Sequence, residues 1–442
     1  MTHYDYCVVG SSAAAAGAVE AIRSVDPSGR LAVVSEERVA FYSRPLLTRV
    51  ITAGASAEDL AYRPKGFLEE NRVEVRLGAR VDAVDHENRR LLLSTGEELS
   101  YGRLLLATGS AAKVPPVPGR DLAGVHTLAS LADAQAVAAS LGSSGGSTGP
   151  RTRSAVVIGG GLIGLQGAEA LREVGLEVAV IEGLDRPLAT VLDRDTSTLV
   201  QEVLAANGVT VLTSQMVKAL RANPSDPARV GSAVLGDGRE LQADVVILAT
   251  GVQPRTELLK GLGLAPGRGF PVNSHMATPW PDVYAAGDAA EVSDLLRGGA
   301  RPFPIWPTAY AGGRVAGLNM AGQQADLPGQ VAMNTFHFFG LTVASAGIVE
   351  PPADEGCEVL TAGPPPGRGP DAHHRKLVLK DGRLVGFVCV GEAIDRCGLA
   401  TGLIRQQVRV EGFRESLLKD FGLAPWPEEI RSKYLSREGI LS

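Results

Sequence analysis

The chain has 442 residues, of which 45% are hydrophobic and 21% charged, and its net charge at pH 7 is −6. This length and composition suit a globular protein of two or three domains. The acidic balance argues against a nucleic-acid partner or a membrane surface as the binding target. We find no run of about 18 apolar residues in the sequence and therefore predict no membrane span. We also find no basic leader and therefore expect no signal peptide. We therefore expect a cytoplasmic protein.

The first 36 residues predict a strand, a glycine turn, a helix and a second strand. An apolar strand at residues 6–9 leads into Gly10, and an alanine-rich helix follows over residues 11–23. A second apolar strand at residues 31–34 ends next to Glu36. This order is typical of a dinucleotide-binding unit.

The glycine pattern of this first turn is degraded. Ser12 stands at the second glycine position and Ala15 at the third, where alanine is an accepted substitute. The serine hydroxyl can add a hydrogen bond to a phosphate. The backbone of Ser12, Ala13 and Ala14 is therefore a candidate phosphate site.

The segment that follows contains a small sheet and a hinge. Residues 73–93 alternate in polarity, which predicts antiparallel strands with a turn at residues 86–89. A strand then ends in Ala107-Thr108-Gly109. The proline-rich residues 114–119 are expected to separate two domains, and residues 142–150 are expected to form a surface loop.

Residues 154–182 repeat the first unit with the glycine pattern complete. An apolar strand leads into Gly159, Gly161 and Gly164. In such a turn these glycines permit the bend, the approach of a pyrophosphate and the packing of helix on strand. The helix N-terminus adds free amides and partial positive charge. Strand, turn and helix together predict a dinucleotide site.

The residue that ends the following strand bears on which nucleotide binds. Glu182 stands where a carboxylate accepts from both ribose hydroxyls and repels a 2′-phosphate. Arg186 lies close by in the sequence, and a guanidinium there keeps NADP open as the alternative. We expect NAD.

The chain therefore contains an internal duplication. The second copy also closes with a strand that ends in Ala249-Thr250-Gly251, as the first copy closes at Ala107-Thr108-Gly109. A protein that binds one nucleotide needs one such unit, so two copies predict two dinucleotides.

A short strand at residues 283–286 then ends in Gly287 and Asp288. Asp288 either caps a helix or accepts from a sugar-alcohol hydroxyl. A helix is expected from residues 306 to 320, because Trp306-Pro307-Thr308 places proline at a helix start.

From residue 327 the composition changes. Residues 377–390 predict a hairpin turned at Asp381-Gly382, residues 364–370 predict a loop, and residues 401–439 are amphipathic and helical.

Together these motifs resemble the pyridine nucleotide–disulfide oxidoreductase superfamily of two-dinucleotide flavoproteins. The resemblance implies FAD in the first unit and NAD(H) in the second. It implies that Glu36 holds the adenosine ribose of FAD and that Asp288 holds its ribityl chain. The start of the helix at Thr308 would face the flavin, where the helix dipole stabilises negative charge.

Members of this superfamily that reduce disulfides carry redox cysteines shortly after the first unit, and this chain has none there. Residues 42–45 read Tyr-Ser-Arg-Pro, which resembles the rubredoxin-, ferredoxin- and nitrite-reductase-type branch that passes electrons to an external acceptor. In relatives a lysine after the Arg-Pro pair contacts a glutamate near the flavin. Arg49 and Gln166 stand at the matching places. Arg49 either bonds Gln166 or flavin, or has a structural role.

The four cysteines are Cys7, Cys357, Cys389 and Cys397. Cys7 is expected to pack in a core strand. No spacing predicts zinc or an iron–sulfur centre, so we expect no metal site. Cys389 and Cys397 are eight residues apart, which leaves a dithiol as an alternative.

Residues 333–340 resemble the flavin subunits of phenylglyoxylate dehydrogenases, which serve larger iron–sulfur or metal-containing complexes. This resemblance implies redox partner subunits with iron–sulfur or metal cofactors, and a homodimer is also open. His337 either faces the flavin or a partner, or packs in the core.

We therefore expect an α/β protein with two Rossmann-like dinucleotide-binding domains and a C-terminal α+β domain. The FAD domain is discontinuous (1–113 and 246–326), the NAD domain is inserted in it (114–245), and an interface domain follows (327–442). The expected function is an FAD-dependent NAD(H):acceptor oxidoreductase that serves a partner redox protein or complex. The alternatives are a stand-alone NADH oxidase or small-acceptor reductase, and a non-catalytic assembly module that no longer holds FAD.

The candidate catalytic residues are Arg49, Gln166 and His337. The expected cofactor-binding residues are Gly10, Ser12, Ala13, Ala14, Glu36, Arg44, Pro45, Arg49, Ala107, Thr108, Gly109, Gly159, Gly161, Leu162, Ile163, Gly164, Glu182, Thr250, Gly251, Gly287, Asp288 and Thr308.

Overall fold

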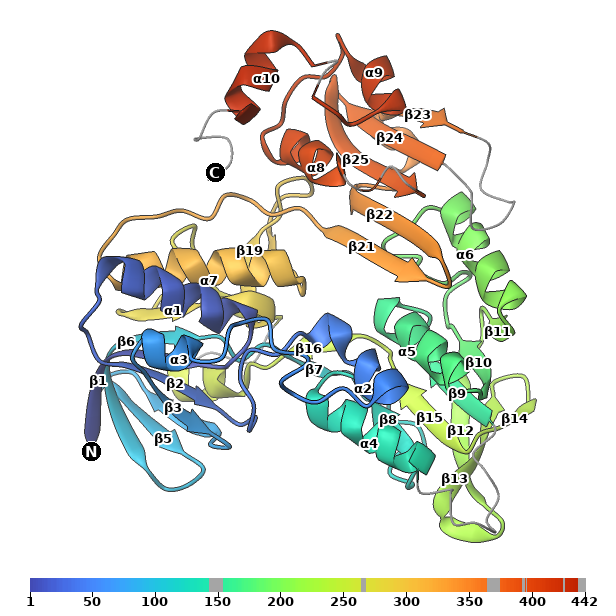
Figure 1. The fold of residues 1–442 in the computed structure, drawn as a ribbon, viewed down its shortest axis with the longest axis horizontal. Coiled ribbons are helices and arrows are strands. Elements are labelled where there is room, and N and C mark those ends of the chain that lie inside the picture. Colours follow the sequence, from blue (N-terminus) through green and yellow to red (C-terminus); the bar gives the residue numbers. More distant parts are fainter. Residues whose placement is uncertain are drawn as a thin grey trace. The chain divides into compact units, whose positions relative to one another are not determined.

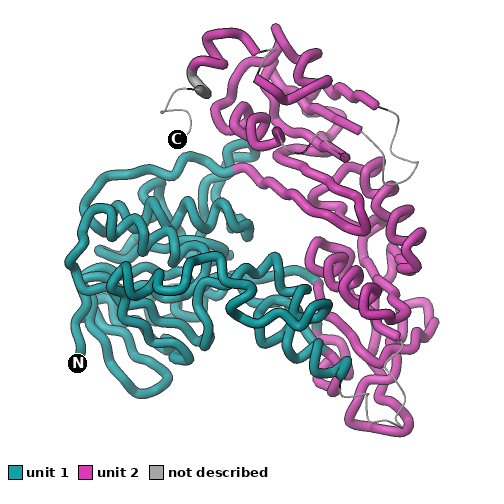
Figure 2. The backbone as a smooth tube through the Cα atoms, viewed as in Figure 1, with its two compact units in different colours: residues 1–115, 126–143, 250–330 teal, residues 116–125, 144–249, 331–442 magenta. Residues whose placement is uncertain are grey.

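The computed structural model describes residues 1–142, 154–263, 268–363, 374–391, 394, 396–423 and 426–435. The chain forms two compact units (Figure 2). Unit 1 comprises Met1–Pro115, His126–Ser143 and Thr250–Gln330, and unit 2 comprises Pro116–Val125, Ser144–Ala249 and Val331–Ser442. The first boundary falls inside the proline-rich segment expected to act as a hinge. The division into three domains stays a prediction.

A seven-stranded sheet forms the core of unit 1, in the order β3-β2-β1-β6-β5-β4 with β18 paired to β6. The pairs β1–β2, β2–β3, β1–β6 and β6–β18 are parallel, and β4–β5 and β5–β6 are antiparallel. The parallel strand β2 is buried along its whole length, as its continuous apolar run predicts. The bounds are β1 Thr2–Val9, β2 Leu31–Ser35, β3 Val73–Leu77, β4 Val81–Asp85, β5 Arg90–Leu93, β6 Glu98–Leu106 and β18 Val283–Ala285.

One expectation for this sheet is wrong. Alternation over residues 73–93 predicts antiparallel strands throughout, but β3 pairs in parallel with β2. Only β4 and β5 form the expected hairpin, with its turn at residues 86–89. An alternating pattern reports that one strand face is buried, and it carries no information on strand direction.

Two helices, α1 (Ala13–Val25) and α7 (Trp306–Met320), lie side by side in unit 1 (Figure 1). Their contact depends on small residues. A Cβ added to Gly313 would overlap the carbonyl oxygen of Ala14, and one added to Gly17 would overlap that of Tyr310. The two helix backbones therefore touch, which fixes the start of α1 against α7. The observed bounds of α7 confirm the helix expected at residues 306–320.

Shorter elements complete unit 1. Strands β7 and β16 pair antiparallel, and β17, β19 and β20 form a small sheet. The bounds are η1 Arg44–Leu46, α2 Thr48–Ala53, α3 Phe67–Glu70, β7 Ser110–Ala112, α4 Leu131–Gly142, β16 Val252–Pro254, η2 Glu257–Leu262, β17 Phe270–Pro271, η3 Gly287–Ala289, β19 Ala290–Ser293 and β20 Ala300–Arg301.

The second large sheet has the order β11-β10-β9-β15-β8. Its strands β9, β10, β11 and β15 belong to unit 2 and pair in parallel, while β8 lies where the chain passes from unit 2 to unit 1. A three-stranded antiparallel sheet, β12-β13-β14, packs against it through a shared apolar cluster that includes Val156 and Leu235. The bounds are β8 Val125–Thr127, β9 Ser154–Ile158, α5 Leu162–Glu173, β10 Glu177–Ile181, α6 Arg194–Ala206, β11 Val209–Leu212, β12 Val217–Asn223, β13 Asp226–Leu235, β14 Glu240–Gln242 and β15 Val245–Leu248.

The C-terminal part of unit 2 is an antiparallel sheet, β21-β22-β25-β24-β23, and its described residues also form the helices α8, α9 and α10. The expected hairpin is confirmed, because β24 and β25 are joined at Asp381 and Gly382, which both have positive φ. The bounds are β21 Met333–Phe338, β22 Leu341–Gly347, η4 Ala353–Glu355, β23 Glu358–Ala362, β24 His374–Lys380, β25 Arg383–Val390, α8 Cys397–Arg405, α9 Arg414–Lys419 and α10 Glu428–Leu435.

The observed elements confirm the predicted α/β fold class. The loop expected at residues 142–150 lies outside the described residues except for Gly142, which ends α4, and the loop expected at 364–370 lies wholly outside them. Across the ranges that the structure does describe, the helices are all too short or too polar to cross a lipid bilayer.

Candidate functional site

The first glycine turn lies in unit 1 between β1 and α1. Gly10 has a φ of 122°, and a Cβ at this position would overlap the carbonyl oxygen of Ala107. Only glycine fits a turn that passes so close to the neighbouring strand. Ser12 is the N-cap of α1, but its hydroxyl makes no capping hydrogen bond. The hydroxyl and the first amides of α1, at Ala13 and Ala14, therefore suit an anionic ligand.

Asp288 lies beside the start of α1. Gly287 packs so closely on this helix that an added Cβ would lie 3.3 Å from the Cβ of Ala14. The Ser110 hydroxyl donates to Oδ2 of Asp288 at 2.6 Å. Burial raises the pKa of the Asp288 carboxyl above its usual value, and the hydrogen bond from Ser110 and the charge of Arg44 oppose that rise. The helix-cap alternative is wrong, because Asp288 lies inside η3, whose N-cap is Ala286.

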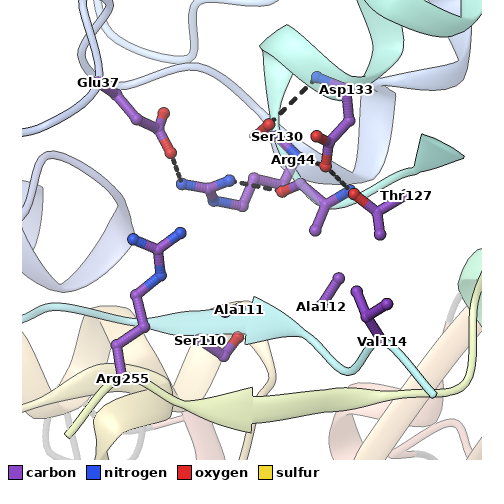
Figure 3. Close-up of a pocket in the computed structure, with 11 residues that line it drawn as sticks. Glu37, Arg44, Ser110, Ala111, Ala112, Val114, Thr127, Ser130, Asp133 and Arg255 are labelled. Carbon is purple, nitrogen blue, oxygen red and sulfur yellow. Dashed lines mark hydrogen bonds and ion pairs between the residues drawn. The ribbon is translucent and has the colours of Figure 1, made fainter. Parts of the chain in front are cut away.

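Arg44 lines a cavity of about 220 Å³ in unit 1 (Figure 3). Its guanidinium donates to Glu37 Oε1 and to the carbonyl of Ala129, each at 2.6 Å. Arg255 extends into the same cavity from the opposite side, and Ser110 also lines it. The Arg44 guanidinium at this cavity suits an anionic ligand such as a diphosphate.

Arg255 also forms an ion pair with Glu36, the carboxylate expected to hold a ribose. The backbone of Arg255 is fixed to the Ala-Thr-Gly turn of β6: its N–H donates to the Gly109 carbonyl at 2.9 Å, and its carbonyl accepts from the Thr108 hydroxyl at 2.8 Å. Sequence reasoning missed Arg255. Its position four residues after Gly251, in the second copy of the same motif, is the signal that was available.

Other predicted residues of unit 1 take part in local bonds. The Thr250 hydroxyl donates to the Lys113 carbonyl at 2.6 Å, and Lys113 N–H donates to the Gly251 carbonyl at 2.9 Å. The Thr308 hydroxyl is buried and donates to Gln330 Oε1 at 3.2 Å. The hydroxyl proton of Thr308 is therefore already used, and we expect Thr308 to serve a ligand through the backbone at the start of α7. Pro45 lies within η1, next to Arg44.

The second glycine turn lies in unit 2 between β9 and α5. A Cβ on Gly164 would overlap the carbonyl oxygen of Gly159, so the helix packs on the strand as expected. By contrast, a Cβ on Gly161 would meet nothing within 4 Å. The turn therefore has open space where a pyrophosphate is expected, next to the first α5 amides at Leu162 and Ile163.

Glu182 follows β10 and reaches back to this turn. Its Oε2 accepts from the Gly160 N–H at 2.6 Å, and its Oε1 accepts from the Leu184 N–H at 2.7 Å. Each carboxylate oxygen has a second lone pair with which it can accept from a ribose hydroxyl. Two backbone amides hold the carboxylate in place before any ligand arrives.

The three candidate catalytic residues are not brought together by any described contact. Arg49 is exposed on α2 of unit 1, and Gln166 is half-buried on α5 of unit 2. Their pairing stays a prediction. His337 is exposed on β21 with its Nδ1 3.0 Å from the Thr342 hydroxyl, so the core-histidine alternative is wrong.

The C-terminal sheet does contact α5. The N–H of Phe339, next to His337, donates to Glu169 Oε1 at 2.6 Å, and burial raises the pKa of the Glu169 carboxyl. The strand pair β21–β22 is thereby fixed to the helix that starts at the second glycine turn.

Three of the cysteines fall into two groups: Cys7, which packs in a core strand as expected, and the pair Cys389 and Cys397. Cys7 is fully buried in β1, and burial raises the pKa of its thiol to about 12. Cys389 and Cys397 are both buried free thiols. A hydrogen bond from Cys397 holds the pKa of Cys389 below its usual value. The two thiols do meet in space, and a role as a functional dithiol remains an alternative.

Comparison with known proteins agrees with this geometry. A protein-family model described as "Pyridine nucleotide-disulphide oxidoreductase" matches residues 4–325. The NADH-dependent phenylglyoxylate dehydrogenase subunit epsilon of Aromatoleum evansii is 31% identical over 408 residues, which are 91% of this chain and 92% of that protein. The ferredoxin–NAD(+) reductase component of the biphenyl dioxygenase system of Paraburkholderia xenovorans is 32% identical over 347 residues, 78% of this chain and 82% of that protein.

Among solved structures, the NAD-dependent persulfide reductase from A. fulgidus superposes with a TM-score of 0.84 at 29% sequence identity. The match covers 93% of this chain and 78% of that one. The likeness therefore extends over most of this chain.

Proposed function

Since the chain belongs to the pyridine nucleotide-disulphide oxidoreductase family and is an oxidoreductase that uses FAD and NAD(H), we propose that it passes electrons from NADH to a separate redox protein. Two of the relatives named above are a subunit and a component of larger enzyme systems. An iron–sulfur protein is the partner class that we favour.

The position of the cysteines carries this proposal. Cys7 is the one cysteine of the sequence that falls in unit 1, and it is buried in β1 with its thiol pKa raised to about 12. Such a thiol is not a nucleophile at neutral pH. Without a dithiol beside the first glycine turn, electrons that reach unit 1 leave to an acceptor outside the chain.

The residues of unit 1 fit FAD, which when bound supplies the chemistry of two-electron uptake and one-electron release. We assign the diphosphate to the α1 N-terminus and Arg44, and a ribose to Glu36. Asp288 is the acceptor for the ribityl hydroxyls. The N-terminus of α7 contributes partial positive charge.

The residues of unit 2 fit NAD(H). The open space at Gly161 and the α5 amides would hold the diphosphate. Glu182, fixed by two backbone amides, would accept from the adenosine ribose. Hydride transfer itself needs no acid or base from the protein, so we assign none.

Steady-state assays of the purified, FAD-loaded chain test the proposal. We expect NADH to bleach the flavin, fast turnover with ferricyanide or an iron–sulfur protein, and slow turnover with oxygen. Oxygen consumption as fast as ferricyanide reduction would contradict the proposal in favour of an NADH oxidase. A colourless chain that cannot bind FAD would instead support an assembly module.

A further inference from the structure

We propose that Glu350 sets the nucleotide preference of this chain, by holding Arg186 in an ion pair where it cannot bind a 2′-phosphate. The inference rests on the proposed binding of NAD(H) at the second glycine turn. All of the residues involved lie in unit 2.

Arg186 lies in a loop that is fastened to the second glycine turn on both sides. Before it, the Leu184 N–H donates to Glu182 Oε1 at 2.7 Å. After it, the Leu188 N–H donates to the Gly160 carbonyl at 2.9 Å. The loop therefore stays beside the turn and beside the carboxylate that we assign to the ribose.

An arginine near this position is the group that accommodates the 2′-phosphate of NADP in dinucleotide-binding folds. Its planar guanidinium binds a phosphate through two parallel hydrogen bonds. NAD and NADP differ only in that phosphate. Glu182 repels that phosphate in every variant that keeps it, so the state of Arg186 determines whether the loop offers a cation that offsets this repulsion.

In this structure the guanidinium of Arg186 is held by two carboxylates. Nη1 lies 3.0 Å from Asp185 Oδ1, and Nη2 pairs with Glu350 Oε2. The Arg186 side chain is only 13% exposed. Asp185 also accepts from Arg194 at 2.6 Å. Two guanidinium groups and two carboxylates form a charge-balanced cluster.

Glu350 is the part of this cluster whose loss would release Arg186. Asp185 has a second cation in Arg194, so it does not depend on Arg186 for its charge balance. Glu350 reaches Arg186 from the segment that follows β22, far away in the sequence. Its removal frees Nη2 and also takes away a negative charge that would repel a phosphate.

Nucleotide binding by four variants tests the inference without any need for turnover. The variants are Glu350→Ala, Glu350→Gln, Glu350→Ala with Arg186→Ala, and the control Glu355→Ala, which removes an exposed pair with Lys380. Calorimetry would measure the affinity for 2′,5′-ADP and for 5′-AMP, which differ by the 2′-phosphate. Thermal melting would confirm that each variant is folded.

We expect Glu350→Ala to tighten 2′,5′-ADP binding about tenfold and to leave 5′-AMP binding within about twofold. Glu350→Gln should give a smaller gain, since its amide still accepts from Arg186. The double variant and the control should gain nothing. The ratio of kcat/KM for NADPH to that for NADH should rise with the binding ratio.

Two results would overturn the inference. In one, Glu350→Ala binds 2′,5′-ADP no more tightly than the wild type does. In the other, the gain persists after Arg186 is removed. If the wild type binds neither 5′-AMP nor NADH, the proposed nucleotide site itself fails, and the inference fails with it.

Discussion

The two glycine turns share one backbone frame. Gly10 and Gly159 have φ values of 122° and 113°. Each donates its N–H at 2.8 Å to the strand on one side, to Val34 in the first turn and to Ile181 in the second. The strand on the other side donates to the residue before each glycine, again at 2.8 Å. The frame survives although Ser12 and Ala15 have replaced glycines in the first turn.

The carboxylates at the two strand ends differ. Glu36 pairs with the side chain of a cation, Arg255, while Glu182 accepts from two backbone amides. A ribose that approaches Glu36 competes with a guanidinium for the carboxylate, whereas a ribose that approaches Glu182 meets an acceptor that backbone amides already hold in place. The same frame therefore gives one site with an internal competitor and one that is preorganised.

The largest expected effect concerns the frame. Gly164→Ala places a methyl group on the Gly159 carbonyl, and we expect it to reduce the free energy of unfolding by about 3 kcal/mol or more. Gly161→Ala is the matched control in the same turn, because its methyl group meets open space. It should cost no more than about 1 kcal/mol yet raise the KM for NADH. Urea denaturation measures the loss of stability in each variant, and equal losses would refute the packing role of Gly164.

The next effect concerns the fixed acceptor. Glu182→Ala should raise the KM for NADH about tenfold or more, because a charged acceptor of ribose hydroxyls is lost. The KM for NADPH should change far less, since the repulsion of its 2′-phosphate is lost at the same time. Glu177→Ala, on the exposed side of β10, is the control. Equal changes for both nucleotides would contradict the ribose role.

A smaller effect should follow from removing the competitor in the first site. Arg255→Ala frees Glu36, while Arg44 and α1 still face the diphosphate. Because the Arg255–Glu36 pair is more than a third exposed, we expect FAD to bind only about twofold to fivefold more tightly. Fluorescence titration of the flavin-free protein measures this. Weaker binding would show that Arg255 holds FAD rather than competing with it.

The smallest expected effect concerns the buried carboxyl of Asp288 in the first site. The pKa of Asp288 is raised in the folded chain, so the folded state binds its proton more tightly than the unfolded state does. Stability of the flavin-free protein should therefore fall as pH rises from the usual aspartate pKa through the raised value. Asp288→Asn should remove this fall and raise the stability of the flavin-free protein at neutral pH. The same variant should bind FAD more weakly. If its stability depends on pH as that of the wild type does, the result would contradict this account.

The sequence predicted the backbone of the two glycine turns and of α7 better than the side-chain contacts between residues far apart in the chain. Glycine spacing, apolar strands and Trp306-Pro307 at a helix start are local signals, and the turns and α7 appear where expected. The partner of Glu36 is 219 residues away in the chain, and no local pattern reports such a contact. Strand direction at β3 was missed for a similar reason, because the pairing depends on the crossover and not on the residues of the strand.

His337 shows a related limit. Its neighbours Phe336 and Phe338 are buried, and the aromatic run made a buried histidine a reasonable alternative. The strand alternates its faces, so His337 points away from both phenylalanines and is exposed.

The central claim is that electrons pass from NADH to flavin and then leave the chain, with no sulfur relay inside it. An anaerobic titration of the FAD-loaded protein with NADH, followed by flavin absorbance, tests it most directly. We expect complete bleaching at roughly one NADH per FAD, because the flavin is the one two-electron acceptor. Consumption of a second equivalent before the flavin is fully reduced would reveal a redox-active disulfide in the chain and contradict the account.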